Sequence, residues 1–375
     1  NNPASQMTFT NNDMQDEGKR SYGVLELTRS SLIDNYTDDD YYRVSLYWIS
    51  FPFDVAIKDI FGFGTYGKHW LIQSYNGQKR ADNGLWADSD TNWEYHSNPN
   101  SLNAGTQYEG IMKKGVGYVV ALNRKRIIGD SLFLGRIDRI ALYFPATTTI
   151  QDHIDNGQSE NIDVPEHVCT INRPTPQGNR TNRDSHWNVI GVPSYADPIS
   201  SLLYYYRWDG QYDAYTLMSS ANGDAFKTMN AYMVQYAGTL NWSNVVEERS
   251  AIAAKRNTDD NKKHHLRLEL QQNGEIKDYT YITMQDEDVT TGFDFNFDLC
   301  KIINKGSNIY SIITNEESPV EVAANVLPIE ETIIPLGVVS AAAGEYTFAM
   351  PNGTDGIVVE LIDYETNTRT NMLLD

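Results

Sequence analysis

The chain has few cysteines and no long hydrophobic run. Its 375 residues include only Cys169 and Cys300, which are too far apart in sequence to indicate a disulfide framework. This count fits a cytosolic protein, and it fits equally well a bacterial surface protein that folds without disulfides. The longest apolar tract, Ile333 to Gly344, is well short of the ~20 residues that span a bilayer, so we expect no transmembrane segment.

Basic side chains are also scarce. The 30 Lys and Arg residues stand against 50 Asp and Glu residues, which gives a formal net charge of −20. This balance argues against nucleic acid and anionic lipid as the main partner. The excess carboxylates form a solvated acidic surface in one interpretation and bind divalent cations in the other.

The sequence contains no catalytic signature. Neither a G-x-S-x-G nucleophile motif nor a glycine-rich phosphate loop occurs. His167 and Cys169 lack the second ligand pair that a zinc site needs. No pair among the 50 acidic residues stands out as the two carboxylates of a glycosidase. We therefore expect that the chain is not an enzyme and that, calcium apart, it has no cofactor.

Aromatic side chains are plentiful by contrast. The 24 Tyr, 12 Phe and 7 Trp residues are more than a disordered chain would carry, so we expect folded protein throughout. The length allows two or three domains.

Three short blocks recur in the same order in two parts of the chain. They pair Ser50–Phe53 with Gly191–Ser194, Tyr75–Gln78 with Trp208–Gln211, and Gly117–Val120 with Ala231–Val234. Matched blocks in one order indicate a duplicated unit. Residues 79–110, which are rich in Asn, Asp and Gly, have no counterpart in the second copy, and we interpret them as an insertion.

Strand patterns bounded by turns follow one another along the chain. Tyr42, Val44, Leu46 and Trp48 alternate on one face of an extended segment that Pro52 ends. Similar segments recur at short spacing up to the C-terminal end. We predict an all-β fold of tandem antiparallel β-sandwich domains, of the jelly-roll or immunoglobulin-like type.

Four local patterns give more specific predictions. Asn76–Gly77 is a strong hairpin-turn signal. Phe61–Gly67 has too many glycines for a helix and predicts a loop, and Arg126–Ile128 predicts a strand. Phe293–Asp298 alternates aromatic with polar side chains, which predicts a half-buried strand; a structural cation bound by its polar side chains is the alternative.

Composition also suggests domain boundaries. We expect a first β-sandwich repeat over residues 1–165, with its insertion at 79–110, and a second repeat over 166–245 that stands alone or packs with the first as one unit. Residues 246–263 are charged and poor in aromatics, which is typical of a linker. Residues 264–375 then form a C-terminal β-sandwich.

The second copy carries motifs of a known family. Trp187–Pro193 reads W-N-x-I-G-x-P, Tyr206–Gly210 reads Y-x-W-x-G, and Ala231–Val234 is a strand of small, aromatic and aliphatic residues. In these motifs the chain resembles the large secreted surface proteins of Bacteroidetes-type bacteria that leave the cell by the type IX route. The first copy departs from the pattern, since Trp48 lies two places nearer its proline and Ser50 replaces the glycine.

The C-terminal third is similar to the β-sandwich that such proteins place before their sorting domain. The matching segments include His265–Leu268, Gly292–Asp294, Asn325–Pro328 and Gly344–Thr347. The resemblance implies a β-sandwich fold and a place outside the cell or on the outer surface of a Gram-negative bacterium. It also implies that the chain is a fragment, followed by another strand and a sorting segment, and it carries no catalytic residues.

Residues Asn1–Ala4 lack the basic and apolar regions of a secretory signal. A chain that begins after a removed signal would look the same.

The insertion contains an incomplete calcium motif. Asp88, Asp90, Asn92 and Glu94 place oxygen ligands at alternate positions, as the start of a calcium loop does. The glycine after the third ligand and the distal glutamate are missing. A polar loop without a metal is the alternative.

The same insertion holds aromatic residues among polar ones. Trp86, Trp93 and Tyr95 could stack on sugar rings while neighbouring Asn and Asp side chains bond hydroxyl groups. The alternative is that these aromatic side chains cap the core.

Three functions remain open. The first is a non-enzymatic secreted or cell-surface protein that acts in adhesion or as a structural stalk, with a host or other extracellular protein as partner. The second is a surface protein that binds a glycan. The third is an accessory region of a larger secreted hydrolase.

Overall fold

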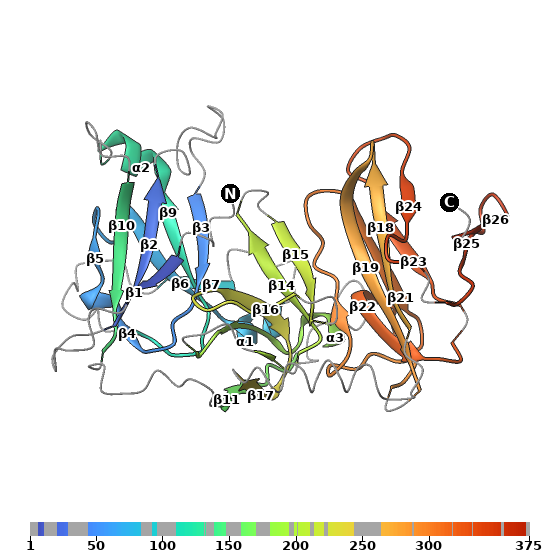
Figure 1. The fold of residues 1–375 in the computed structure, drawn as a ribbon, viewed down its shortest axis with the longest axis horizontal. Coiled ribbons are helices and arrows are strands. Elements are labelled where there is room, and N and C mark those ends of the chain that lie inside the picture. Colours follow the sequence, from blue (N-terminus) through green and yellow to red (C-terminus); the bar gives the residue numbers. More distant parts are fainter. Residues whose placement is uncertain are drawn as a thin grey trace.

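The computed structural model shows a chain of short strands with few helices (Figure 1). It describes residues 7–10, 21–28, 44–83, 92–95, 110–130, 132, 139–147, 159–169, 181–194, 199–200, 202–210, 214–220, 224–243, 264–286, 289–316, 318–331, 333–353 and 356–372. Among these residues, no helix has the length and apolar character needed to cross a membrane.

The first part of the chain forms two four-stranded antiparallel sheets and a short strand pair. The strands are β1 (Met7–Thr10), β2 (Tyr22–Thr28), β3 (Val44–Ile49), β4 (Val55–Ala56), β5 (Phe61–Gly62), β6 (Trp70–Tyr75), β7 (Trp93–Tyr95), β8 (Ile111–Met112), β9 (Tyr118–Asn123) and β10 (Arg139–Pro145). One sheet has the order β3-β9-β6-β7, the other has the order β1-β2-β10-β5, and β4 pairs with β8.

Side chains from both four-stranded sheets share one hydrophobic core. On β10, Ile140, Leu142 and Phe144 are buried at alternate positions, as expected for a strand with one apolar face. The buried side chains that β3, β6 and β9 contribute to this core lie on one face of each strand. The other face of these three strands points toward the cavity described below.

The second part of the chain repeats this arrangement. Its strands are β11 (Ser159–Val164), β12 (Trp187–Gly191), β13 (Ile199–Ser200), β14 (Tyr204–Asp209), β15 (Ala214–Ser219), β16 (Ala231–Gln235) and β17 (Gly238–Ser243). The order β12-β16-β14-β15 corresponds strand by strand to β3-β9-β6-β7, and β11-β17-β13 corresponds to β2-β10-β5. The two copies therefore share their strand order as well as their sequence blocks.

The two copies meet through equivalent residues. Ile49 pairs with Asn230, and Ile190, the counterpart of Ile49, pairs with Val116, the counterpart of Asn230. The backbone bond from Ser50 N to Met229 O (3.2 Å) is likewise repeated from Gly191 N to Gly115 O (2.8 Å). A contact in which each side uses the same positions has local twofold symmetry.

Residues Ser50 and Gly191 face each other across this symmetric contact. Ser50 Oγ donates to the carbonyl of Asn230 (2.6 Å) and accepts from Val192 N (3.0 Å). A Cβ at position 191 would come within 2.3 Å of the Ser50 Cβ. Only one copy can carry a side chain here, which explains why the first copy has serine where the second has glycine.

The C-terminal part forms one seven-stranded sheet and a separate hairpin. Its strands are β18 (His264–Gln272), β19 (Glu275–Gln285), β20 (Leu299–Cys300), β21 (Asn308–Ile313), β22 (Val320–Pro328), β23 (Leu336–Val339), β24 (Thr347–Ala349), β25 (Glu360–Asp363) and β26 (Thr368–Asn371). The order is β23-β21-β22-β19-β18-β24, with β20 on β22 and the β25–β26 hairpin apart. Strands β19 and β22 are parallel, so this sheet is mixed, where the sequence had predicted antiparallel pairing.

One hydrophobic cluster spans all three parts. It contains Trp48 from the first copy, Tyr206 and Met233 from the second, and Tyr281 and Val322 from the C-terminal sheet. Figure 1 shows the first copy, the second copy and the C-terminal sheet side by side in that order.

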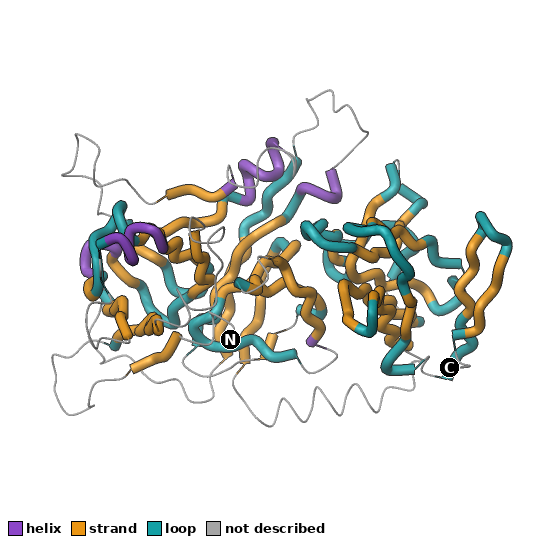
Figure 2. Tube along the Cα trace, turned by 90° about the horizontal axis from the view of Figure 1, so that it is seen from above, coloured by secondary structure: helices purple, strands orange, loops and turns teal. Residues whose placement is uncertain are grey.

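In the described part of the chain, the strands are interrupted by the 3-10 helix η4 (Ile57–Asp59) and by three short α-helices, α1 (Gly77–Asn83), α2 (Arg124–Gly129) and α3 (Thr181–Asp184). Helices α1 and α3 pack against each other, and Figure 2 shows the helices against the strands. The predicted hairpin turn at Asn76–Gly77 is wrong, because α1 begins there and the partner strand β7 follows only afterwards. The predicted strand at Arg126–Ile128 is also wrong; it belongs to α2, where Asn123 caps the helix by accepting from Arg126 N (3.1 Å).

The segment Phe293–Asp298 is a turn and not the predicted strand. Asp294 accepts from Asn296 N (2.8 Å), and Asp298 accepts from the backbone N–H groups of Asp294 (2.7 Å) and Val326 (2.8 Å). Burial raises the pKa of Asp298 to about 7, against the effect of these two hydrogen bonds.

The predicted loop at Phe61–Gly67 contains β5 at its start, paired with β10. Much of the predicted insertion and the whole predicted linker at 246–263 lie outside the described residues.

Candidate functional site

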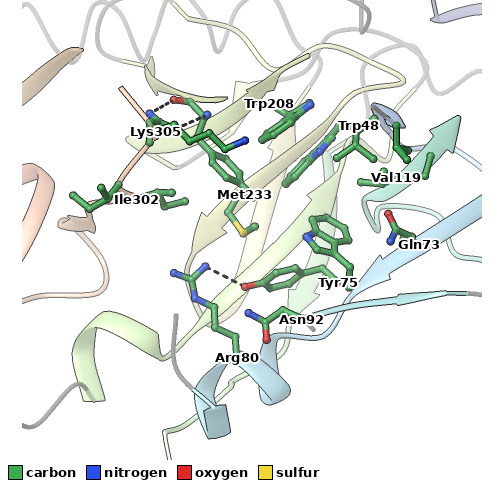
Figure 3. A pocket seen from close by; sticks show the side chains of 17 residues that line it. Trp48, Gln73, Tyr75, Arg80, Asn92, Val119, Trp208, Met233, Ile302 and Lys305 are labelled. Atoms are coloured by element: carbon green, nitrogen blue, oxygen red, sulfur yellow. Dashed lines mark hydrogen bonds between the residues drawn. The ribbon is translucent and has the colours of Figure 1, made fainter. Parts of the chain in front are cut away.

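A cavity of about 560 Å³ opens where the two copies and the C-terminal part meet. This volume lies within the ~300–1,000 Å³ typical of small-molecule sites. Its wall includes side chains from β3, β6, β7, β9 and α1 of the first copy, from β14, β15 and β16 of the second, and from residues 302–305. The cavity is shown in Figure 3.

Strand alternation explains why the first sheet can line this cavity. Leu46 and Trp48 on β3 point into the cavity, whereas Tyr47 and Ile49 between and after them enter the hydrophobic core. Successive side chains of a strand point to opposite faces. One face of the sheet therefore packs in the hydrophobic core, and the other lines the cavity.

Trp48 is the centre of an aromatic cluster on the cavity wall. Its ring centroid lies 5.0 Å from Trp93 in an edge-to-face arrangement and 6.0 Å from Trp208 in a stacked one, with an interplanar angle of 12°. Tyr215 meets it edge to face at 5.7 Å. These separations are those of favourable aromatic pairs.

Each copy supplies one cross-strand aromatic pair to this cluster. Tyr75 lies opposite Trp93 in the β6–β7 register, at 5.1 Å between ring centroids. Trp208 lies opposite Tyr215 in the β14–β15 register, at 5.2 Å. Tyr75 and Trp208 begin the same repeated block, so the duplication placed one aromatic pair from each copy on the same wall.

Helix α1 brings a buried cation to the cavity. Asn76 caps the helix by accepting from Lys79 N (2.8 Å), and Arg80 follows on the next residue. Arg80 is 3% exposed. Its Nη1 donates to the hydroxyl of Tyr75 (3.1 Å; Figure 3). Its guanidinium lies over the ring of Trp187, at 4.0 Å from the ring centroid.

Burial raises the pKa of Tyr75, which the neighbouring Arg80 charge opposes. The Tyr75 hydroxyl is therefore neutral near pH 7.

Several buried polar atoms of the residues around the cavity have no hydrogen-bond partner among the described residues. They are the indole Nε1 of Trp48 and of Trp208, the Oδ1 of Asn92, and the Nε and Nη2 of Arg80. Leaving a buried donor or acceptor unpaired costs about 1–3 kcal/mol, and more for a charged group. Buried atoms of this kind also occur elsewhere in the described residues, for example at Tyr205 and Trp242.

The structure places part of the predicted site on this cavity. Trp93 lies in its wall, and so does Asn92. Glu94 is exposed and accepts from Asn76 Nδ2 (2.9 Å). Tyr95 ends β7, and its side chain lies outside the described part of the structure, as do Trp86, Asp88 and Asp90.

Among the described residues, no group of three or more His, Cys, Asp or Glu side chains could hold a metal ion. The calcium site at Asp88, Asp90, Asn92 and Glu94 stays a prediction, because its first two ligands are not described.

The sequence did not indicate the rest of the site. Trp48 and Trp208 were interpreted as strand residues of a repeated unit, and Tyr215 was given no role. Arg80 carried no signal, because the turn predicted at Asn76–Gly77 excluded the helix that positions it. The repeated block that begins at Tyr75 and Trp208 was the available clue to a shared aromatic wall.

Comparison of the chain with protein families, with curated proteins and with solved structures finds no match.

Proposed function

We propose that the protein is a non-enzymatic adhesion protein that binds a glycan in the cavity where its two copies and its C-terminal part meet. The observation that carries this proposal is the combination of five aromatic rings with polar side chains, among them Gln73, Asn92 and Asn304, around one cavity. Sugars offer apolar ring faces for stacking and hydroxyl groups for hydrogen bonds, and this wall supplies partners for both.

The charge of the lining argues against a cationic ligand. Aromatic cages also bind quaternary ammonium groups. However, the described side chains that line this cavity include Arg80 and Lys305 and no Asp or Glu. A ligand that is neutral or negatively charged fits this lining better than a cation.

The proposed architecture is a tandem array of antiparallel β-sandwiches, with the mixed C-terminal sheet as its last part. Support comes from the shared core between the two sheets of the first copy and from the matching strand order of the second. We also propose that the protein is displayed outside a Gram-negative cell. The resemblance to secreted surface proteins and the acidic composition support this location.

A glycan array probed with the full chain tests the proposal, followed by titration calorimetry with the sugars that bind. We expect Trp93→Ala and Trp208→Ala each to weaken binding by about tenfold or more, because truncating an anchor tryptophan at a binding site costs about 2 kcal/mol or more. Tyr364→Ala is the matched control, since Tyr364 is 76% exposed on the β25–β26 hairpin, away from the cavity.

Binding that survives both tryptophan variants would show that the cavity is not the glycan site. Absence of binding to every sugar on the array would leave adhesion to a protein partner as the better proposal.

A further inference from the structure

We propose that Asn304 of the C-terminal part is a positioning residue for the glycan site, and that it acts by holding Tyr215 of the second copy in the aromatic wall. This inference rests on the proposed function and names the residue through which the C-terminal part contributes to that site. It follows from the hydrogen bonds of Asn304 and from the place of Tyr215 among the aromatic rings.

The side chain of Asn304 pairs with the backbone of Tyr215 as a neighbouring strand would. Its Oδ1 accepts from Tyr215 N (2.9 Å), and its Nδ2 donates to Tyr215 O (3.1 Å). An amide side chain offers an acceptor and a donor side by side, as peptide groups do. Tyr215 lies on β15, the edge strand of its sheet, so these two bonds satisfy backbone groups that no strand of the described chain pairs with.

The turn that carries Asn304 is itself fixed. Asn304 N donates to Asn308 Oδ1 (2.9 Å), and Asn308 Nδ2 donates to the carbonyls of Asn304 (3.0 Å) and Gly306 (2.7 Å). Asn308 begins β21 and is fully buried. Two residues before Asn304, the backbone N–H of Ile302 donates to the Tyr206 hydroxyl (3.2 Å). The Asn304 amide therefore bonds β15 from a rigid support.

Tyr215 contacts two tryptophans of the wall. Its ring lies edge to face with Trp48 of the first copy at 5.7 Å and with Trp208 of the second copy at 5.2 Å. It also meets the ring of Tyr206 edge to face, at 6.1 Å. A shift of Tyr215 would therefore change how Trp48 packs against Trp208, although these two residues come from different copies.

A wall that is fixed before the ligand arrives favours binding. A ring that is already held in place loses little side-chain entropy when a sugar stacks on it. Ordering one free side chain on binding weakens affinity by about threefold to tenfold. The C-terminal part should therefore strengthen glycan binding through the position that Asn304 gives to Tyr215.

Asn304→Ala tests the inference on the full chain, with the sugar that binds most tightly on the array. We expect its affinity in titration calorimetry to fall by about threefold to tenfold, because Tyr215 must then be ordered when the sugar binds. Asn241→Ala is the matched control. Asn241 is exposed on β17 and is not among the described residues that line the cavity, so its loss should leave the affinity unchanged.

A double-mutant cycle with Tyr215→Ala separates positioning from direct contact. If Asn304 acts through the Tyr215 ring, Asn304→Ala should change the affinity by less than about twofold once that ring is absent. A residue that itself bonded the sugar would cost as much affinity without the ring as with it. That result would overturn the positioning role.

Circular dichroism gives a readout that a loss of stability alone would not move. The rings of Trp48 and Trp208 stack at 6.0 Å with an interplanar angle of 12°, and indole rings this close couple their transitions into far-ultraviolet bands of opposite sign. We expect Asn304→Ala to weaken these bands and Asn241→Ala to leave them unchanged. Unaltered bands in a folded Asn304→Ala variant would overturn the inference.

The outcomes separate the two proposals. Native affinity in a folded Asn304→Ala variant would overturn the positioning role and leave the glycan site standing. If that variant does not fold, Asn304→Asp decides in the same way, since it has nearly the same shape and loses the bond to Tyr215 O. A blank array with the native chain would overturn the glycan site and this inference with it.

Discussion

At the scale of single residues, Ser50 and Gly191 show how a duplicated sequence fits a symmetric contact. The two positions are equivalent, and a Cβ at residue 191 would meet the Ser50 Cβ at 2.3 Å and the carbonyl oxygen of Val116 at 2.7 Å. The contact therefore has room for a side chain in only one of the two copies, and serine in the first copy is compatible with glycine in the second.

Exchanging these two residues tests the symmetry directly. We expect Gly191→Ser to lower the free energy of unfolding by about 1–3 kcal/mol, because it overpacks a closed contact. Adding Ser50→Gly should restore much of that loss, since the serine would then use the equivalent groups on the other side. Urea denaturation measures both. A double variant that is less stable than Gly191→Ser would contradict local twofold symmetry.

The turn residue Asp298 gives stability a pH dependence. Its pKa is about 7 in the folded chain and near 3.8 ordinarily, so the folded state keeps a proton that the unfolded state has already released between these values. The free energy of unfolding should therefore fall as the pH rises from about 4 to about 7, by at most about 4 kcal/mol from this group. Asp298→Asn should remove that slope in urea denaturation across this range. If the free energy of unfolding changes with pH in the same way in both proteins, Asp298 does not titrate between pH 4 and 7.

At the scale of elements, helix α1 is the feature that brings a cation to the cavity. It lies between β6 and β7 in the chain and carries Arg80 to the cavity wall. Gly77 begins it against the second copy, where a Cβ would lie 2.1 Å from the Trp187 carbonyl oxygen.

Substituting Gly77 should therefore displace α1. We expect Gly77→Ala to lower the free energy of unfolding by about 1–3 kcal/mol through overpacking, and to weaken glycan binding because α1 forms part of the cavity wall. Gly129→Ala, in α2, is the control, because no atom lies within 4 Å of its added Cβ. Equal stability of the two variants would mean that α1 does not pack as described.

The sequence predicted the strands better than the helices. The alternation that places Leu46 and Trp48 on one face of a strand is a local property of the sequence, and the folded strand keeps it. The prediction of a hairpin turn at Asn76–Gly77 was wrong because asparagine favours both type I′ turns and helix N-caps. The contact of Gly77 with the second copy decides between the turn and the helix. The prediction of a strand at Arg126–Ile128 was wrong because its β-branched isoleucines favour strands. Asn123, which caps the helix, lies before that segment.

The candidate site was only partly predictable for a related reason. Trp93 drew attention as an aromatic residue among polar ones, which is visible locally. The cavity needs Trp48, Trp208 and Arg80 as well, and these come together only through the contact between the copies. No pattern within one segment contains that information.

At the scale of the whole molecule, buried hydrogen bonds join the second copy to the C-terminal part. The hydroxyl of Tyr206 in the second copy donates to Cys300 O (3.0 Å) and accepts from Ile302 N (3.2 Å) in the C-terminal part. Tyr204 and Thr283 hydroxyls are also bonded across this boundary, at 2.7 Å. These contacts hold the segment that closes one wall of the cavity.

Loss of the Tyr206 hydroxyl should affect stability and binding together. We expect Tyr206→Phe to lower the free energy of unfolding by about 1–3 kcal/mol, because it leaves two buried backbone groups unpaired. Glycan affinity should fall as the wall at Ile302 loosens. Tyr364→Phe, at an exposed tyrosine, should change neither. Lower stability with unaltered affinity would show that the wall does not depend on this contact.

A crystal structure of the full chain with the oligosaccharide that binds most tightly tests the central claim most directly. We expect sugar density in the cavity, with sugar rings in contact with Trp93 and Trp208. Sugar bound elsewhere on the molecule, with this cavity closed to it, would contradict the account.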